Sequence, residues 1–304
     1  MIALRRILCP IDFSEHSRRA LDHAVAIARW YGSSITALHV IAPAPMPVFG
    51  PGPVMFEPAM MTSVDREQVI ANLDQFVRAE AAPGVAIASA VREGSAATEV
   101  LAQAGEMNAD LVAIGTHGRS GFERLLLGSV TEKVLQKAPC PVLTVPSEHP
   151  GTVPASPVVF KRILCPTDFS ESATRALDYA VSLAQEADGD LTVLHVLPHG
   201  YESTDVVADG RMTLADFMRQ READLRERLS EAVPDDVAAY CRVHTLMTRG
   251  KPWQEILREA NERQSELIVM GVQGRAAIDL MVFGSTTQHV VRQASCPVLT
   301  VRAI

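Results

Sequence analysis

Several patterns that mark other classes of protein are missing from this sequence. No apolar run reaches the roughly 18 residues of a membrane-spanning helix, and the start is too short for the apolar core of a signal peptide. The formal net charge is -8 with no long block of one sign, so we expect neither a nucleic-acid nor a membrane partner. The motifs G-x-S-x-G, H-E-x-x-H and G-x-G-x-x-G are also missing, so we predict no catalytic residue and no metal site.

Cysteine is sparse and unpaired in sequence. None of the five cysteines forms a C-x-x-C pair, and four are followed by proline in apolar surroundings. We therefore expect buried free thiols in a reducing cytoplasm rather than metal ligands or redox groups. The five are Cys9, Cys140, Cys165, Cys241 and Cys296.

What the chain does contain is a long internal repeat. Arg6-Ile-Leu-Cys-Pro is found again from Arg162, and Cys140-Pro-Val-Leu-Thr-Val again from Cys296, each 156 positions later. A glycine pattern, G-x2-G-x9-G-S, repeats at the same offset. It occurs at Gly115, Gly118, Gly128 and Ser129, and again at Gly271, Gly274, Gly284 and Ser285.

A repeat of this length indicates one whole domain copied, because solenoid repeats are only about 20–50 residues long. The hydrophobic content of 47% with 21% charged residues is typical of globular domains. Residues 147–157 are rich in proline with glycine, serine and threonine, as in a surface linker. We predict a first domain at 1–146, a linker at 147–157 and a second domain at 158–304.

Each half alternates strand and helix signals, which predicts an α/β fold with a doubly wound, five-stranded parallel sheet flanked by helices. The strand order that we expect for this sheet is 3-2-1-4-5. Ser14 is placed to cap the first helix, and Ser95 to open a later one. In the first half, strands are expected at 6–11, 35–41, 85–91, 110–115 and 141–145. The first helix is expected after Ser14, with its apolar stripe at 20–28, and further helices at 65–81, 95–107 and 129–137. The second half follows the same order, with Pro252 in the first turn of its third helix.

In such a sheet, ligands bind outside the carboxyl ends of the strands, where neighbouring connections diverge. Strands one and four would lie side by side there, bringing Asp12 close to the glycine pattern. Gly115 and Gly118 would let the backbone turn its N–H groups inward, in conformations that a Cβ disfavours. Gly128 would allow close approach, and the N–H groups of Ser129 and the next residue would start a helix whose dipole favours phosphate.

These residues resemble the universal stress protein family over nearly the whole chain, as two tandem domains. The resemblance rests on the start with Pro10, Asp12, Ser14 and Ser17, on the glycine loop, and on the terminal Cys-Pro-Val-Leu strand. It implies a cytoplasmic stress-response protein that binds ATP or another adenine nucleotide, with Mg as a possible companion ion. It also implies dimerisation through the last strand, hence an internal pseudo-dimer and a possible homodimer.

The resemblance and the residue pattern together predict one nucleotide site per domain. Asp12 is suited to ribose hydroxyls or a metal ion, and Val40 to the base. The first site is predicted to contain Pro10, Asp12, Val40, Gly115, Gly118, Arg119, Gly128, Ser129 and Val130. The second is predicted to contain Pro166, Asp168, Val196, Gly271, Gly274, Arg275, Gly284, Ser285 and Thr286.

The two copies differ within the glycine loop. Ser120, Gly121 and Arg124 are replaced by alanine, alanine and leucine in the second copy, and Ser17 corresponds to Ala173. We therefore expect the first domain to bind nucleotide more tightly.

Several alternatives stay open at this point. Asp12 could serve only a turn or a helix start, and the midstrand histidines, His39 and His195, are more typical of hydrogen-bonded core residues than of ligands. The insert 42–61, rich in proline, glycine and methionine, could be a surface loop, a lid or a partner-binding surface. Gly250-Lys251 is expected to be a strand–helix turn, not a P-loop.

The function is expected to be that of a nucleotide-dependent sensor or interaction module without designed turnover. A nucleotide-independent interaction protein and a slow ATP hydrolase are the alternatives.

Overall fold

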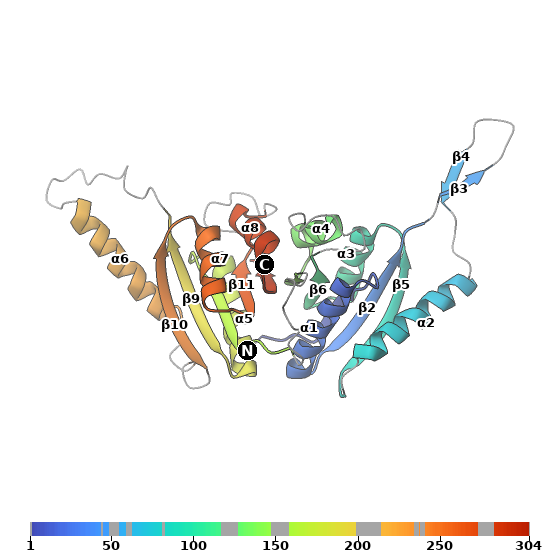
Figure 1. The fold of residues 1–304 in the computed structure, drawn as a ribbon, viewed down its shortest axis with the longest axis horizontal. Helices are drawn as coiled ribbons and strands as arrows, with labels where there is room; N and C mark the ends of the chain where they lie inside the picture. The colour runs from blue at the N-terminus through green and yellow to red at the C-terminus, as the bar shows by residue number, and fades with distance from the viewer. Residues whose placement is uncertain are drawn as a thin grey trace. The chain divides into compact units, whose positions relative to one another are not determined.

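The computed structural model describes residues 2–43, 45–48, 55–58, 63–80, 83–116, 127–146, 158–198, 214–233, 237, 241–272 and 283–303. The chain divides into two compact units, one spanning Ala3–Ser147 and one whose main span is Glu148–Ile304. The predicted linker, 147–157, lies outside the described residues. Figure 1 shows alternating strands and helices in each unit.

The first unit contains a parallel sheet in the predicted order. Its described strands are ordered β5-β2-β1-β6-β7, and every neighbouring pair is parallel. The predicted 3-2-1-4-5 order is therefore confirmed. The elements of this unit are β1 (Arg6–Pro10), α1 (Glu15–Tyr31), β2 (Ser34–Ile41), β3 (Pro45–Val48), β4 (Met55–Pro58), α2 (Ser63–Glu80), β5 (Ala86–Glu93), α3 (Ala96–Glu106), β6 (Leu111–Gly115), α4 (Ser129–Lys137) and β7 (Val142–Val145).

The second unit repeats this arrangement. Its described strands are ordered β10-β9-β8-β11-β12, again with parallel neighbours, so the same prediction is confirmed here. Its elements are β8 (Arg162–Pro166), α5 (Glu171–Ala187), β9 (Asp190–Leu197), α6 (Leu214–Glu231), β10 (Arg242–Arg249), α7 (Pro252–Glu262), β11 (Leu267–Gly271), α8 (Ser285–Gln293) and β12 (Val298–Val301).

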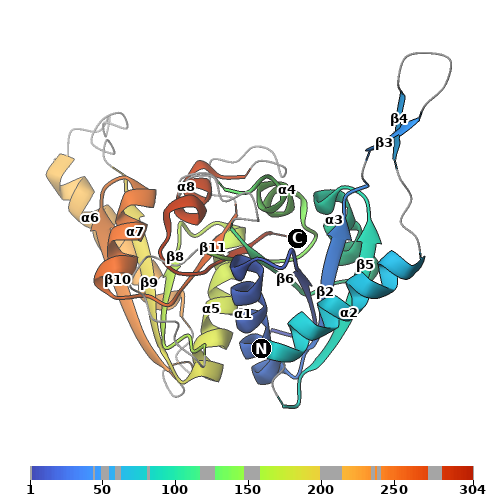
Figure 2. The ribbon, with the colours of Figure 1, turned by 45° about the vertical axis from the view of Figure 1, so that its right-hand side comes forward.

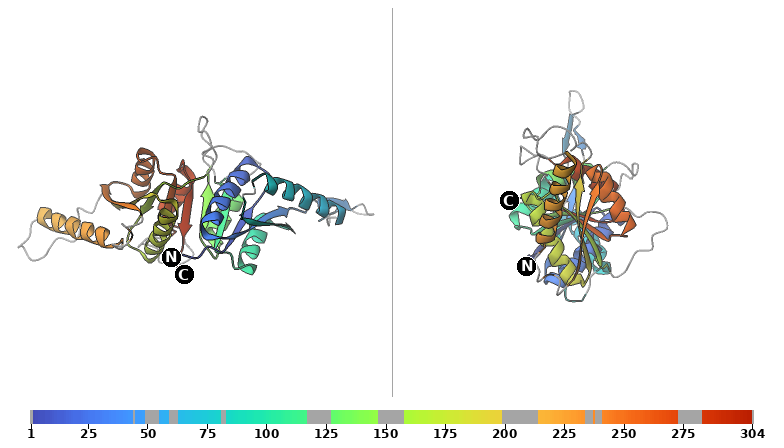
Figure 3. Two further views of the ribbon diagram at one scale, coloured as in Figure 1. Left: turned by 90° about the horizontal axis from the view of Figure 1, so that it is seen from below. Right: turned by 90° about the vertical axis from the view of Figure 1, so that its left-hand side faces the viewer.

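Helices cover both faces of each sheet. In the first unit, α1 and α2 pack together on one face, and α3 and α4 pack together on the other (Figure 2). In the second unit, α5 packs against one face and the paired α7 and α8 cover the other (Figure 3). Because the central strands are covered on both sides, their side chains are buried without alternation, as in β6, where all five residues are buried.

The helix starts follow from the local sequence. The Ser14 side chain accepts a hydrogen bond from the N–H of Ser17 at 3.2 Å, which caps α1 as predicted. Ser95 precedes α3 as expected, but its side chain makes no capping hydrogen bond. Pro252 begins α7, where its fixed φ suits the first turn. Gly250 and Lys251 form the turn between β10 and α7, as expected.

Helix α6 carries ion pairs between residues of neighbouring turns. Arg219 pairs with Asp216 at 2.7 Å, and Arg226 pairs with Glu222 at 2.6 Å, at spacings of three and four residues.

The insert after β2 contains structure that its composition did not indicate. Strands β3 and β4 pair antiparallel, with Pro45 opposite Pro58 and Val48 opposite Met55 (Figure 1). The other residues of the insert between 44 and 62 lie outside the described part of the chain. The lid and partner-binding readings of this insert remain predictions.

Candidate functional site

The candidate site of each unit lies at the carboxyl edge of its sheet. In the first unit, β1 lies between β2 and β6, with Pro10 paired to Leu38 and Leu8 paired to Val112. The ends of these three strands are therefore neighbours, and they place Pro10, Val40 and Gly115 along one edge.

The second unit has the same register. Pro166 pairs with Leu194, and Leu164 pairs with Ile268. Pro166, Val196 and Gly271 therefore occupy the corresponding edge of the second sheet.

Hydrogen bonds join the two ends of each glycine loop. In the first unit, the N–H of Gly128 donates to the carbonyl of Thr116 at 2.8 Å, and the hydroxyl of Thr131 donates to the carbonyl of Gly115 at 2.8 Å. The end of β6 and the start of α4 are therefore held at one point. Residues 117–126, including Gly118 and Arg119, lie outside the described residues.

The same two ties occur in the second unit. Gly284 N–H donates to the Val272 carbonyl at 3.0 Å, and the Thr287 hydroxyl donates to the Gly271 carbonyl at 3.0 Å. Sequence reasoning missed the threonine ties, although a threonine three residues after the last glycine of each motif was a visible signal. Residues 273–282, including Gly274 and Arg275, lie outside the described part.

The reason for the first glycine of each motif differs from the prediction. Gly115 is the last residue of β6 and pairs with Val145, so it is extended backbone rather than a turn. A Cβ built on Gly115 would lie 3.0 Å from both Cβ and the carbonyl oxygen of His16 in α1. Gly115 therefore allows β6 and the first turn of α1 to approach closely. The predicted turn at Gly115 was wrong, and its role toward a phosphate stays a prediction.

Helices α4 and α8 present their N-termini at this edge. Ser129 and Ser285 are the first helical residues, and Val130 and Thr286 are the second, as predicted. Each helix has a glycine N-cap, which provides no side-chain acceptor for the N–H groups of the first turn. The helix dipole adds partial positive charge at the same place.

The aspartate after the first strand of each unit shapes a turn. Oδ1 of Asp12 accepts hydrogen bonds from the backbone N–H of Ser14 at 3.0 Å and from its hydroxyl. Oδ1 of Asp168 likewise accepts from the N–H of Ser170 at 3.0 Å. The turn role considered for Asp12 is thus confirmed, and its role toward a ribose or a metal ion stays a prediction.

The two midstrand histidines are hydrogen-bonded, and His195 is buried whereas His39 is half-buried. Nδ1–H of His39 donates to the carbonyl of Ile11 at 2.7 Å, and Nδ1–H of His195 donates to the carbonyl of Thr167 at 2.8 Å. Because a carbonyl can only accept, Nδ1 must carry the proton in both rings.

All five cysteines are buried free thiols, as predicted. Burial raises the pKa of Cys140, Cys165 and Cys296 to about 12, with a smaller contribution from a nearby carboxylate in each case. Burial also raises the pKa of Cys9 and Cys241. These thiols stay protonated at neutral pH, which makes them poor nucleophiles.

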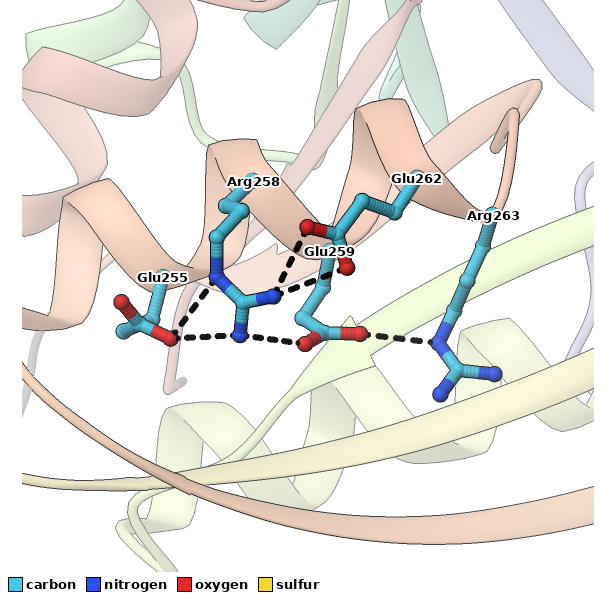
Figure 4. A network of polar contacts seen from close by, with 5 residues as sticks. All are labelled: Glu255, Arg258, Glu259, Glu262 and Arg263. Atoms are coloured by element: carbon cyan, nitrogen blue, oxygen red, sulfur yellow. Dashed lines mark hydrogen bonds and ion pairs between the residues drawn. The ribbon is translucent and has the colours of Figure 1, made fainter.

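An ion-pair network on α7 is specific to the second unit (Figure 4). Arg258 contacts Glu255 at 2.7 Å, Glu259 at 2.6 Å and Glu262 at 2.8 Å, and Arg263 contacts Glu259 at 3.0 Å. Glu259 is buried, with 4% of its surface exposed, so these two arginines compensate a carboxylate that has lost water.

The first unit neutralises the corresponding helix in another way. Arg92 on β5 pairs with Glu99 and with Glu106 of α3, whereas Ala102 stands where α7 has Arg258. In both units one arginine bridges carboxylates two turns apart, but it comes from a strand in one and from the helix in the other. This network stabilises a helix and is not part of the candidate site.

No group of three His, Cys, Asp or Glu side chains in the described ranges is placed to hold a metal ion. Among the helices that the structure describes, none is both long and apolar enough to cross a membrane.

Comparison with known proteins agrees with this arrangement. The profile of the universal stress protein family matches residues 3–146 and again 160–302. The chain belongs to the universal stress protein family. Each of its two units is thus one copy of the family's domain, as the internal repeat predicted.

Individual relatives of this stress-protein chain span one domain or both. A universal stress protein of Mycolicibacterium smegmatis is 27% identical over 312 residues, covering 97% of this chain and 96% of the relative. One from Methanocaldococcus jannaschii is 34% identical over 141 residues, covering 46% of this chain and 81% of the relative. The crystal structure of a universal stress protein from Archaeoglobus fulgidus covers 99% of both chains at 25% identity, with a TM-score of 0.68.

Proposed function

We propose that each unit binds one adenine nucleotide at the carboxyl edge of its sheet. The observation that carries this proposal is that two hydrogen bonds join the ends of each glycine loop. A helix with a glycine N-cap begins there, at the sheet edge that also bears the aspartate turn. A loop that leaves a strand and returns to a helix N-terminus without a side-chain cap is suited to a phosphate chain. The same construction in both units supports two sites per chain.

The proposed contacts follow from the position of each group. The first turn of α4, with Ser129 and Val130, would receive phosphate oxygens together with the glycine loop. Asp12, in its turn, would accept from a ribose hydroxyl, and the end of β2 at Val40 would offer an apolar wall and backbone groups to the base. Mg bound with the phosphates would neutralise part of their charge.

We propose a sensor or interaction module rather than an enzyme. Phosphoryl transfer needs a group that orients the nucleophile, together with cations that stabilise the transition state. The aspartate of each proposed site instead holds its own turn through Oδ1. Slow hydrolysis is the most activity that we expect. The cytoplasmic location, the internal pseudo-dimer and the homodimer that the family resemblance implies stay predictions.

We further propose that the first site binds more tightly, because its loop sequence has Ser120, Gly121 and Arg124 where the second has two alanines and a leucine. The exchange of Ser17 for Ala173 no longer supports this difference. The Ser17 hydroxyl donates to the carbonyl of Ser14 at 2.9 Å and is buried, so it belongs to the helix rather than to a ligand contact.

Nucleotide content and titration test the proposal directly. We expect mass spectrometry to find an adenine nucleotide released from the purified chain on denaturation, and calorimetry to find two ATP sites of unequal affinity. No released nucleotide, together with no binding on titration, would favour the nucleotide-independent interaction protein. Multiple turnover above about 1 s⁻¹, a slow rate for an enzyme, would favour the hydrolase.

Matched substitutions locate the two sites. Ser129 and Ser285 are exposed at helix starts, where an acidic side chain favours the helix but repels phosphate. We expect Ser129→Asp to weaken the tighter site at least about tenfold, and Ser285→Asp the weaker site. Ser95→Asp, the same change at the exposed N-cap of α3, is the control and should leave both unchanged. If the two sites bind ATP with equal affinity and the two substitutions weaken them equally, the predicted difference between the sites is refuted.

A further inference from the structure

The residue that follows each site aspartate has an unusual backbone. Phe13 has φ of 62° and Phe169 has φ of 61°, in the left-handed region. Side chains with a Cβ are disfavoured there because the Cβ approaches the following carbonyl oxygen, and glycine is the usual occupant. A phenylalanine at this position in both units indicates that its ring stabilises the turn enough to offset the strain.

Both rings pack against the histidine of the neighbouring strand. The centroids of Phe13 and His39 are 4.6 Å apart, and those of Phe169 and His195 are 4.9 Å apart, with tilted planes. Contacts of this kind combine apolar burial with a favourable ring geometry.

The outer contacts of the rings come from different residues in the two units. In the first unit, Phe76 of α2 meets Phe13 edge-on, and the Arg18 guanidinium lies 4.4 Å from the centre of the Phe76 ring. In the second unit, the Arg228 guanidinium lies 4.4 Å from the centre of the Phe169 ring itself. The outer support has therefore diverged, whereas the histidine and the left-handed phenylalanine are the same in both.

The same histidines hydrogen-bond to the residue that precedes each aspartate. The carbonyl of Ile11 accepts from His39 at 2.7 Å, while the N–H of Ile11 donates to the carbonyl of Leu38 at 2.8 Å. In the second unit, Thr167 is held in the same two ways, by His195 at 2.8 Å and by the carbonyl of Leu194 at 2.8 Å. Each aspartate thus follows a residue whose carbonyl and N–H are both hydrogen-bonded to the neighbouring strand. It precedes a left-handed phenylalanine whose ring packs against the histidine.

We infer that His39 with Phe13, and His195 with Phe169, are positioning residues that hold the carboxylates of Asp12 and Asp168 in the orientation that binds nucleotide. This inference rests on the proposed nucleotide site. The histidine acts through the chain: it fixes the carbonyl before the aspartate and supports the ring after it. Without that support the turn can relax toward a right-handed or extended residue 13, and the carboxylate rotates away from its hydrogen-bond partner on the ligand.

The test alters both units at once, so that the two sites report together. His39→Leu with His195→Leu removes the donor to the carbonyl, whereas His39→Gln with His195→Gln keeps an N–H donor at the same place. Each variant of the full chain is titrated with ATP and with 2′-deoxy- and 3′-deoxy-ATP. Asp12→Asn with Asp168→Asn shows which hydroxyl the carboxylates contact, since Asn can still accept the hydrogen bond of the turn.

The unmodified chain should bind ATP more tightly than one of the two deoxy analogues. We expect the leucine pair to weaken ATP binding about fivefold, the effect of one net hydrogen bond, and to leave that deoxy analogue unchanged. The glutamine pair should recover at least part of the difference. A purely structural role would weaken all three nucleotides equally, and that result, or no change in ATP binding, would overturn the inference alone. Failure of the unmodified chain to bind any of them would overturn the proposed function and the inference with it.

Discussion

Among the glycines that the structure describes, Gly271 leaves the least space for a side chain. It ends β11, directly against the first turn of α5. A Cβ built there would lie 2.5 Å from Oγ of Ser172 and 2.8 Å from the backbone nitrogen of Ala173. The Ser172 hydroxyl can rotate away, but the backbone of α5 can move only if the helix shifts from the sheet.

The expected loss of stability follows from these contacts. Overpacking a core by one methyl group costs about 1–3 kcal/mol, and contacts with backbone atoms fall at the upper end because they cannot change rotamer. We expect Gly271→Ala to destabilise the chain by about 3 kcal/mol. For Gly115→Ala, where the nearest atoms lie at 3.0 Å, we expect about 1–2 kcal/mol.

Urea unfolding of the full chain, followed by circular dichroism, measures the effect, and calorimetry shows whether the two units unfold in one transition or in two. Gly105→Ala is the matched control. It lies within α3 with nothing within 4 Å of the added Cβ, so the better helix propensity of alanine should stabilise the chain by about 0.5–1 kcal/mol.

A second substitution separates the two kinds of contact. Adding Ser172→Ala to Gly271→Ala removes the hydroxyl contact but not the backbone contacts, so it should restore only a small part of the stability. Gly271→Ala with the midpoint of the unmodified chain would refute the reasoning. A greater loss for Gly115→Ala than for Gly271→Ala would do so as well.

Three further predictions concern stability. Burial holds the pKa of Cys140, Cys165 and Cys296 near 12, so these thiols stay neutral in the folded chain, whereas the unfolded chain ionises them above about pH 9. The midpoint of urea unfolding should therefore fall between pH 9 and 12, and it should fall less steeply for Cys165→Ala. Ser14→Ala should lower the free energy of unfolding by about 1 kcal/mol because the cap is lost, whereas Ser95→Ala should change it little. Equal effects of the two substitutions on the melting temperature would contradict this. Arg263→Leu leaves Glu259 with one ion-pair partner fewer, and we expect it to cost only about 1 kcal/mol because the Arg263 side chain is exposed. Glu259→Leu in that background should recover the melting temperature.

Much of the fold was predictable because the signals that specify it are local. The bounds of α4 were predicted to the residue, since Gly128 and the proline after Cys140 delimit a short periodic segment. The parallel sheet followed from alternating strand and helix signals, and the structure confirms the strand order that we expected. The hairpin of β3 and β4 was not predicted, because prolines in both strands mask the usual strand signal.

The candidate site was predictable only in part. Repetition along the chain identified the glycine loops and the two aspartates, but not the contacts that surround them. Thr131 and Gly115 are tied across 16 residues, and His39 reaches Ile11 across 28, which no local pattern encodes. The left-handed conformation of Phe13 is equally invisible in sequence, because residue type alone predicts the opposite.

By itself, the sequence determined the duplication and the α/β class, because periodicity and spacing carry that information along the chain. Only the tertiary structure decided why particular residues are there. Gly115 and Gly271 are glycines because a helix packs on them, and each of the two histidines holds the carbonyl before an aspartate. These roles depend on atoms that meet in space from distant positions, and packing alone brings such atoms together.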